Sequence, residues 1–137
     1  VLVCQPNTHA IALMGELSAR ALMVKDTKGY LMDGHCRDVA DILEMEFPVF
    51  GRLSTPADIM ERWTYHALGA PITIGTVTIR SGDYLIADMD GAVVIPQEIA
   101  EAAVTQTEKV MAEESDMRKA ILDGMDPEQA YLKYNRF

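Results

Sequence analysis

The segment from Ile72 to Ile95 restricts the fold most strongly, because it combines β-branched residues with closely spaced turn signals. Alternating apolar residues over Ile72–Ile79 predict one half-buried strand. Tyr84–Ala87 and Ala92–Ile95 predict two more, each preceded by a short turn that contains Asp and Gly. Strands that follow one another so closely pair in sequence order, so we expect a β-meander here.

Helical patterns dominate the C-terminal part of the chain. From Gln97 to about Ala120 the sequence predicts a long amphipathic helix, whose apolar positions include Ile99, Ala103, Val110 and Met111. Asp126 and Pro127 predict the start of a final helix, with Asp as the N-cap and Pro in the first helical position.

Short strands and helices alternate in the first part of the chain. Asp38 precedes a short helical run, Val39–Leu43. A longer helical stripe covers about His9–Met23, although Gly15 interrupts it, so a new helix could instead begin at Gly15-Glu16. Loops are expected at 33–38 and 51–56. The predicted strands are Val1–Cys4, Tyr30–Met32 and Phe47–Phe50.

The order of these elements predicts an α/β fold. A chain of 137 residues can form one domain with a substantial core. We expect a single compact domain over residues 1–137, with a mixed central sheet in α-β-β-α layers, similar to swivelling domains, and a long C-terminal helix. Because Val1 begins inside a strand pattern, an N-terminal segment is expected to be missing from this sequence.

Charge and composition exclude some partners. The formal net charge of −9 argues against nucleic acids and anionic membranes, and no apolar run is long enough to span a bilayer. Anionic small molecules remain compatible, because an Arg beside a metal can reverse the local field. The two cysteines, Cys4 and Cys36, make no disulfide framework, so a reduced, cytoplasmic protein is expected.

Arg37 and Asp38 are the first candidates for chemistry. The commoner explanation of such a pair is a surface ion pair beside a helix start. The alternative is a carboxylate ligand for Mg²⁺ next to an Arg fork that binds a substrate carboxylate. The neighbouring His35 and Cys36 are weaker candidates, because adjacent side chains cannot both point at one ion without strain.

Gly15-Glu16-Leu17 is the second candidate. A Gly at a helix start lets backbone N–H groups approach an anion, and the helix dipole favours negative charge there. Taken alone, such a segment usually marks only the entry into a helix. However, the 22 positions between Glu16 and Asp38 give an α-then-β spacing that can bring both loops to one sheet edge, with Glu16 over the same site.

The chain resembles the RraA-like family, whose enzyme members include the 4-hydroxy-4-methyl-2-oxoglutarate / 4-carboxy-4-hydroxy-2-oxoadipate aldolases. The resemblance is carried by Gly15-Glu16-Leu17, Asp33-Gly34-x-x-Arg37-Asp38 and Phe47-Pro48-Val49-Phe50. It extends over Pro71–Tyr84 and Ala87–Pro96, and covers about Val1 to Arg118.

This resemblance implies a divalent-metal site and a 2-oxo acid substrate. Asp38 would anchor Mg²⁺ or Mn²⁺, with waters completing the shell, and Arg37 would contact the carboxylate and the 2-oxo oxygen of the substrate. Glu16 would occupy the acidic position of the family and help to place a water. The backbone amides expected to bind the pyruvyl carboxylate are those of Gly15, Glu16, Leu17 and Ser18.

The resemblance also implies sites shared between subunits of a homotrimer, or of a hexamer made of trimers. A Glu from the C-terminal helix of the neighbouring chain would complete each site. Glu113 and Glu114 both lie at about the right place, and the local sequence does not decide between them.

The expected function is that of a metal-dependent (class II) aldolase. It would cleave 4-hydroxy-2-oxo acids to pyruvate and decarboxylate oxaloacetate through the same pyruvate enolate. These loops contain no lysine for a Schiff base, which favours the metal-dependent route.

Two alternatives belong to other classes of protein. A non-catalytic regulator of the RraA type would bind a ribonuclease, but the regulatory type lacks the acid that this chain keeps at Asp38. A phosphohistidine carrier, whose fold the family resembles, needs a phosphorylatable His in a characteristic turn. His9, His35 and His66 offer no such setting.

Overall fold

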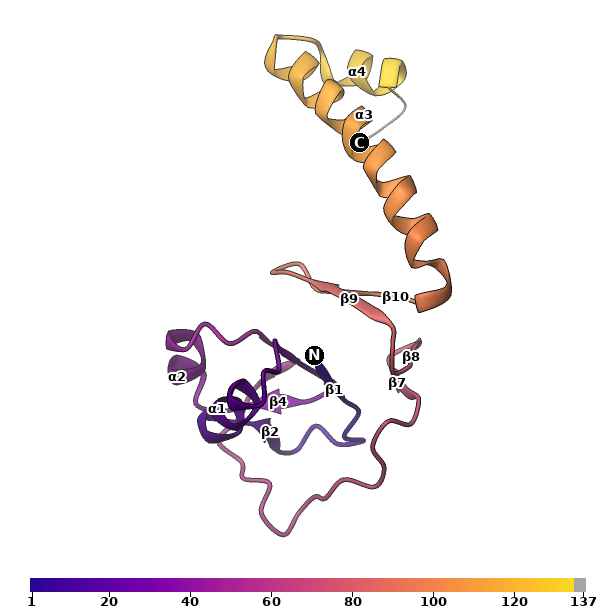
Figure 1. The fold of residues 1–137 in the computed structure, drawn as a ribbon. Coiled ribbons are helices and arrows are strands. Elements are labelled where there is room, and N and C mark those ends of the chain that lie inside the picture. The colour runs from indigo at the N-terminus through magenta and orange to yellow at the C-terminus, as the bar shows by residue number, and fades with distance from the viewer. Residues whose placement is uncertain (135–137) are drawn as a thin grey trace. The chain divides into compact units, whose positions relative to one another are not determined.

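The structure is a computed structural model and describes residues 1–134. The chain divides into two compact units, residues 1–94 and residues 95–137, which are described separately (Figure 1). In unit 1 the elements are β1 (Leu2–Cys4), β2 (Ala12–Met14), α1 (Glu16–Val24), β3 (Tyr30–Met32), β4 (His35–Cys36), α2 (Val39–Glu44), β5 (Val49–Phe50), β6 (Leu53–Ser54), β7 (Ile72–Ile74), β8 (Val77–Ile79), β9 (Tyr84–Ala87) and most of β10 (Ala92–Ile95).

Two small parallel sheets form the centre of unit 1. One has the strand order β1-β3-β5 and the other has the order β2-β4-β6. The chain alternates between the two sheets, so each parallel pair is joined through the other sheet; α1 connects β2 to β3, and α2 connects β4 to β5. Helices and strands together bury one apolar cluster, which consists of Met14, Ala19, Tyr30, Met32, Ile42 and Phe47.

The helix expected over about His9–Met23 is wrong in its first part. Residues 12–14 form β2, and the helix begins only after Gly15, as the alternative start at Gly15-Glu16 predicts. Sheet pairing decides this point, because the Met14 carbonyl accepts a hydrogen bond from the Arg37 N–H at 2.8 Å. Ala12 and Met14 are each only 3% exposed, so the strand also buries its apolar residues.

Two strands lie where loops are expected. β4 occupies the middle of the 33–38 segment and β6 the middle of the 51–56 segment, and the two strands pair in parallel. Each is two residues long. A strand that short cannot show alternation in the sequence, so only its partners reveal it.

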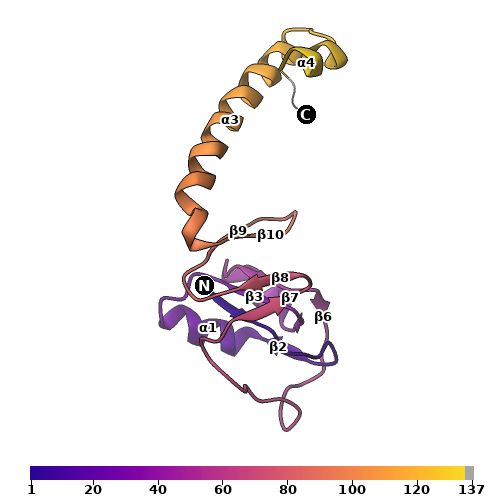
Figure 2. The same ribbon diagram turned by 90° about the vertical axis from the view of Figure 1, so that its right-hand side faces the viewer.

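The segment from Ile72 to Ile95 forms two hairpins instead of one meander (Figure 2). The single strand expected over Ile72–Ile79 is wrong, because the chain reverses at Gly75, which has φ +60°, and β7 then pairs antiparallel with β8. β9 and β10 form a separate sheet. The described strands therefore make four small sheets rather than one mixed central sheet, whereas the mixed α/β class is confirmed.

Unit 2 is helical. A short 3-10 turn, η1 (Gln97–Ile99), leads into α3 (Ala100–Leu122), and α4 (Pro127–Tyr134) follows. The long C-terminal helix and the Asp126 cap are confirmed, since Oδ1 of Asp126 accepts hydrogen bonds from the N–H groups of Glu128 and Gln129 at 3.0 and 3.2 Å. No helix in residues 1–134 is long and apolar enough to cross a membrane.

Candidate functional site

Three loops that follow parallel strands meet at one edge of unit 1. Gly15-Glu16 follows β2, Arg37-Asp38 follows β4, and the loop 55–58 follows β6. The three strands are neighbours in the order β2-β4-β6, so their carboxyl ends lie side by side. Ligands bind preferentially at this edge of parallel sheets. The predicted meeting of the first two loops is confirmed.

Asp38 joins two of these loops. Its Oδ2 accepts a hydrogen bond from the backbone N–H of Glu16 at 3.0 Å, so the carboxylate lies at the start of α1. Asp38 precedes α2 as predicted, but its side chain makes no capping hydrogen bond there. Its backbone is left-handed, with φ 54° and ψ 39°, which turns the carboxylate towards the neighbouring helix.

Gly15 provides the space for this contact. A Cβ at this position would lie 2.7 Å from Oδ2 of Asp38 and 3.0 Å from Nε of Arg37. The φ of Gly15 is −141°, which any residue can adopt. A glycine is therefore required here because two side chains approach the backbone closely. The backbone conformation itself would allow any residue.

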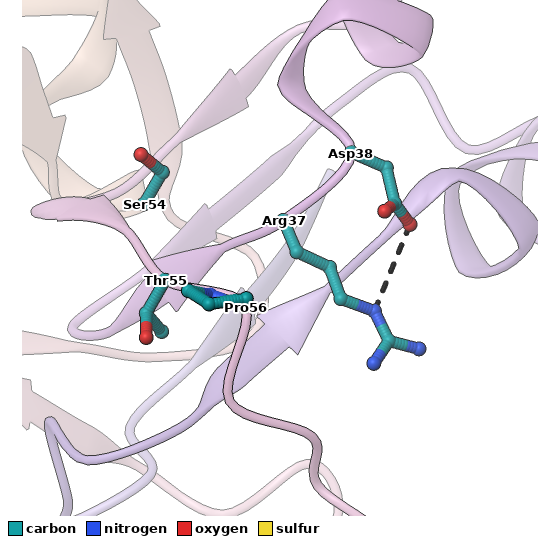
Figure 3. A pocket seen from close by; sticks show the side chains of 5 residues that line it. All are labelled: Arg37, Asp38, Ser54, Thr55 and Pro56. Atoms are coloured by element: carbon teal, nitrogen blue, oxygen red, sulfur yellow. Dashed lines mark ion pairs between the residues drawn. The ribbon is translucent and has the colours of Figure 1, made fainter.

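Arg37 lies between two carboxylates. Its Nε is 3.6 Å from Oδ2 of Asp38 (Figure 3). Its Nη1 donates a hydrogen bond to Oδ2 of Asp58. The contact with Asp58 is the main reason that the pKa of Arg37 is raised and that of Asp58 is lowered. Nη1 is the guanidinium nitrogen that donates to Asp58, which leaves the Nη2 edge to a ligand.

An open pocket of about 470 Å³ lies beside this pair, large enough for a small acid. Figure 3 shows the residues that line it, which are Arg37, Asp38, Ser54, Thr55 and Pro56. A fixed cation and an exposed carboxylate therefore share the wall of one pocket with two hydroxyl groups.

The start of α1 offers fewer free amides than predicted. The amide of Glu16 already donates to Asp38, and the first backbone bond of the helix runs from Ala19 N–H to the Gly15 carbonyl at 3.0 Å. The N–H groups of Leu17 and Ser18 precede that first bond, so both can donate to an anion. The carboxylate of Glu16 pairs with Arg20 along the same helix.

Asp38 fits a hard divalent cation. Its side chain is 42% exposed, and the atoms that contact it engage only Oδ2, which leaves Oδ1 for a ligand. Residues 1–134 contain no cluster of three or more His, Cys, Asp or Glu side chains that could hold a metal. Mg²⁺ and Mn²⁺ suit such a place better than Zn²⁺, because Mg²⁺ is often held by one carboxylate and several waters.

His35 and Cys36 stand apart from this chemistry. Both belong to β4, and the Sγ of Cys36 lies 3.8 Å from the Leu53 carbonyl oxygen. Burial raises the pKa of the Cys36 thiol, which opposes the thiolate form that binds metals. Glu113 and Glu114 lie on α3 in unit 2, so their part in the site stays a prediction.

Asp58, Ser54 and Thr55 are residues of the site that the sequence analysis misses. Ser54 ends β6, and Thr55 and Asp58 follow it, but the sequence does not reveal this strand. The sequence signal that could identify these residues is a third short apolar segment followed by a polar loop. A third parallel strand would place its loop at the same edge of the sheet.

A comparison with known families matches residues 1–94 to the family described as RraA-like: Aldolase/RraA. The chain belongs to the RraA-like family. The chain is 32% identical over 105 residues to a Halalkalibacterium halodurans protein named "Putative 4-hydroxy-4-methyl-2-oxoglutarate aldolase". That match covers 77% of this chain and 50% of the relative. This RraA-like chain thus spans about half the length of the curated relatives it matches.

Solved structures agree with this assignment. An uncharacterized protein from Pseudomonas syringae pv. tomato superposes with a TM-score of 0.91 at 27% identity, covering 97% of this chain and 63% of the other. RraAS2 from Streptomyces coelicolor is described as an unusual member of the RNase ES inhibitor RraA protein family. It gives a TM-score of 0.71 at 26% identity, covering 81% of this chain and 57% of its own.

Proposed function

We propose that this RraA-like protein is a divalent-metal-dependent aldolase that cleaves 4-hydroxy-2-oxo acids to pyruvate. The observation that carries the proposal is the junction of Gly15, Arg37 and Asp38, where an Arg fork and an exposed carboxylate share one pocket. The names of relatives about one third identical support the same activity.

Arg37 is the main electrostatic element of the proposed site. Cleavage of the bond between C3 and C4 leaves the electron pair on the pyruvyl fragment as an enolate. The open Nη2 edge of Arg37 can donate to the 2-oxo oxygen, where that negative charge develops, and a fixed cation there lowers the barrier. The amides of Leu17 and Ser18 can hold the substrate carboxylate.

Asp38 is the residue that would hold the metal. Mg²⁺ or Mn²⁺ in this position supplies Lewis-acid polarisation of the 2-oxo group and neutralises charge on the carboxylate. Oδ1 would bind the metal, whereas Oδ2 keeps the loop attached to the start of α1.

Glu16 takes part in proton transfer in this proposal. The substrate must lose the proton of its 4-hydroxyl group, and the enolate must gain one at C3, both within reach of a carboxylate or its water.

We further propose that the protein forms a homotrimer or hexamer in which Glu113 or Glu114 of a neighbouring copy completes the site. Oxaloacetate is a second substrate on this scheme, since its decarboxylation gives the same enolate.

The test is pyruvate release from 4-hydroxy-4-methyl-2-oxoglutarate and from oxaloacetate, with Mg²⁺ or Mn²⁺ and with EDTA. We expect metal-dependent release that Asp38→Asn lowers by about a hundredfold or more, because the charge is lost while the acceptor for Glu16 remains. Asp26→Asn is the matched control, since Asp26 is an exposed partner of Lys28 and its left-handed backbone, φ 60°, suits Asn.

Two results would contradict the proposal in different ways. Release of no pyruvate from any 4-hydroxy-2-oxo acid or from oxaloacetate would sink the aldolase activity and leave the non-catalytic ribonuclease regulator as the alternative. Full, EDTA-sensitive activity in Asp38→Asn would disprove the metal assignment alone.

A further inference from the structure

Asp58 makes the only side-chain hydrogen bond that Arg37 forms within residues 1–134. Its Oδ2 accepts from Nη1 of Arg37, whereas the approach of Nε to Asp38, at 3.6 Å, is an ion pair without a hydrogen bond. Arg37 has several rotatable bonds and its side chain is 37% exposed, so without this contact its head group would sample several rotamers.

Asp58 is itself held in place by backbone contacts. Its Oδ1 accepts from the Met60 N–H at 2.6 Å, which closes a turn around the side chain. The preceding carbonyl, that of Ala57, accepts from the N–H of Ala12 in β2 at 2.9 Å. At the other end of the loop, the Thr55 N–H donates to the Cys36 carbonyl of β4 at 2.9 Å. The loop that carries Asp58 is therefore attached to both strands that carry the site.

We propose that Asp58 is a positioning residue that fixes the guanidinium of Arg37 so that its Nη2 edge faces the substrate. The inference rests on the proposed aldolase function and deepens it. An exposed ion pair contributes little to stability, so stability alone gives Asp58 no evident role. Its effect on the position of Arg37 matters more, because a misplacement of about 1 Å in a catalytic group can lower the reaction rate by roughly a hundredfold.

The first experiment observes Arg37 directly, without turnover. The ¹⁵N heteronuclear NOE of the Arg37 Nε–Hε group is measured in the wild-type protein, with the signal assigned by its absence in Arg37→Lys. We expect a value near that of the structured backbone, and a clear fall in Asp58→Asn. Asp26→Asn should leave it unchanged. An unchanged value in Asp58→Asn would overturn the proposal, because Asp58 would then not restrain Arg37.

The second experiment is a double-mutant cycle on pyruvate release. Asp58→Asn keeps an oxygen for the Met60 N–H but loses the charge, so we expect kcat to fall by about tenfold to a hundredfold while KM changes much less. In an Arg37→Ala background the same substitution should change kcat/KM by less than about twofold, because a residue that acts only through Arg37 has nothing left to position.

The outcomes separate this inference from the proposed function. Equal effects of Asp58→Asn with and without Arg37 would overturn the positioning role even if the enzyme is an aldolase. A wild-type protein that releases no pyruvate would overturn the proposed function, and the NOE measurement would then decide whether Asp58 restrains Arg37. Thermal unfolding of each variant identifies any loss that comes from misfolding.

Discussion

At the scale of single residues, the candidate site depends on an absent side chain as much as on those present. Gly15 leaves room for Oδ2 of Asp38 at a distance that no Cβ could share, and for Nε of Arg37 at a distance where a Cβ would be crowded. The carboxylate then reaches the Glu16 amide, which joins the two loops. The charged pair and the glycine therefore form one unit, and neither has its observed geometry without the other.

Gly15→Ala should therefore damage the site through space alone. We expect about 1–3 kcal/mol lower unfolding free energy, as for other overpacked positions, together with a fall in kcat/KM as Arg37 and Asp38 move apart. Gly69→Ala is the contrasting control, because Gly69 has φ +72° and open space around its Cβ position. It should lower stability through backbone strain and leave kcat/KM unchanged. Equal kcat/KM in Gly15→Ala and wild type would contradict the argument.

At the scale of elements, the sequence predicts best where a pattern is long or a cap is distinctive. α3 and the Asp126 cap of α4 follow directly from periodicity and capping chemistry. β2, β4 and β6 are two or three residues long and become strands only through pairing with one another. These three strands position the site. The Arg37-Asp38 pair could be predicted from its motif, whereas Asp58 could not, because the short strand before it shows no pattern in the sequence.

An ion pair connects two of the segments that link the two parallel sheets. Asp33, between β3 and β4, accepts a hydrogen bond from Nε of Arg52, between β5 and β6. This contact is the main cause of a lowered pKa for Asp33. His9 Nε2 lies 3.4 Å from the same oxygen and adds a positive charge only when it is protonated. The pair thus links the two chain segments where each passes from one sheet to the other.

Asp33→Asn should lower stability in a pH-dependent way. Because the folded pKa of Asp33 lies below the unfolded value of about 3.8, its contribution is complete above that value and disappears as the pH falls through the folded pKa. We expect a loss of at most about 1 kcal/mol at pH 7, measured by thermal unfolding, and a smaller loss at each step below pH 4. A constant difference between wild type and Asp33→Asn across that range would contradict the prediction, and Asp26→Asn should show little difference throughout.

At the scale of the whole molecule, the residues proposed to carry the chemistry lie in two units. Arg37 and Asp38 lie in residues 1–94, which is the part matched to the RraA-like family, and Glu113 and Glu114 lie on α3 in residues 95–137. If the site is shared between copies, as proposed, then defects in the two units can be placed on different subunits. That division makes the proposed oligomer open to a direct test.

Subunit complementation provides that test. Asp38→Asn and the double variant Glu113→Gln/Glu114→Gln should each lose most of their pyruvate release. After the two are mixed, unfolded and refolded together, some mixed oligomers would contain a site with both intact parts, so activity should return to a fraction of the wild-type value. Light scattering measures the molar mass of the protein and so establishes the oligomeric state. Activity that stays at the level of the separate variants would contradict sharing between subunits.

The left-handed backbone of Asp38 has a consequence for how such proteins diverge. Asn tolerates that conformation at least as well as Asp and can still accept the Glu16 N–H, so the loop can lose its charge and keep its shape. The two amino acids differ by a single base in their codons. If the proposed function is right, one mutational step can thus remove the metal-binding charge and leave the fold unchanged.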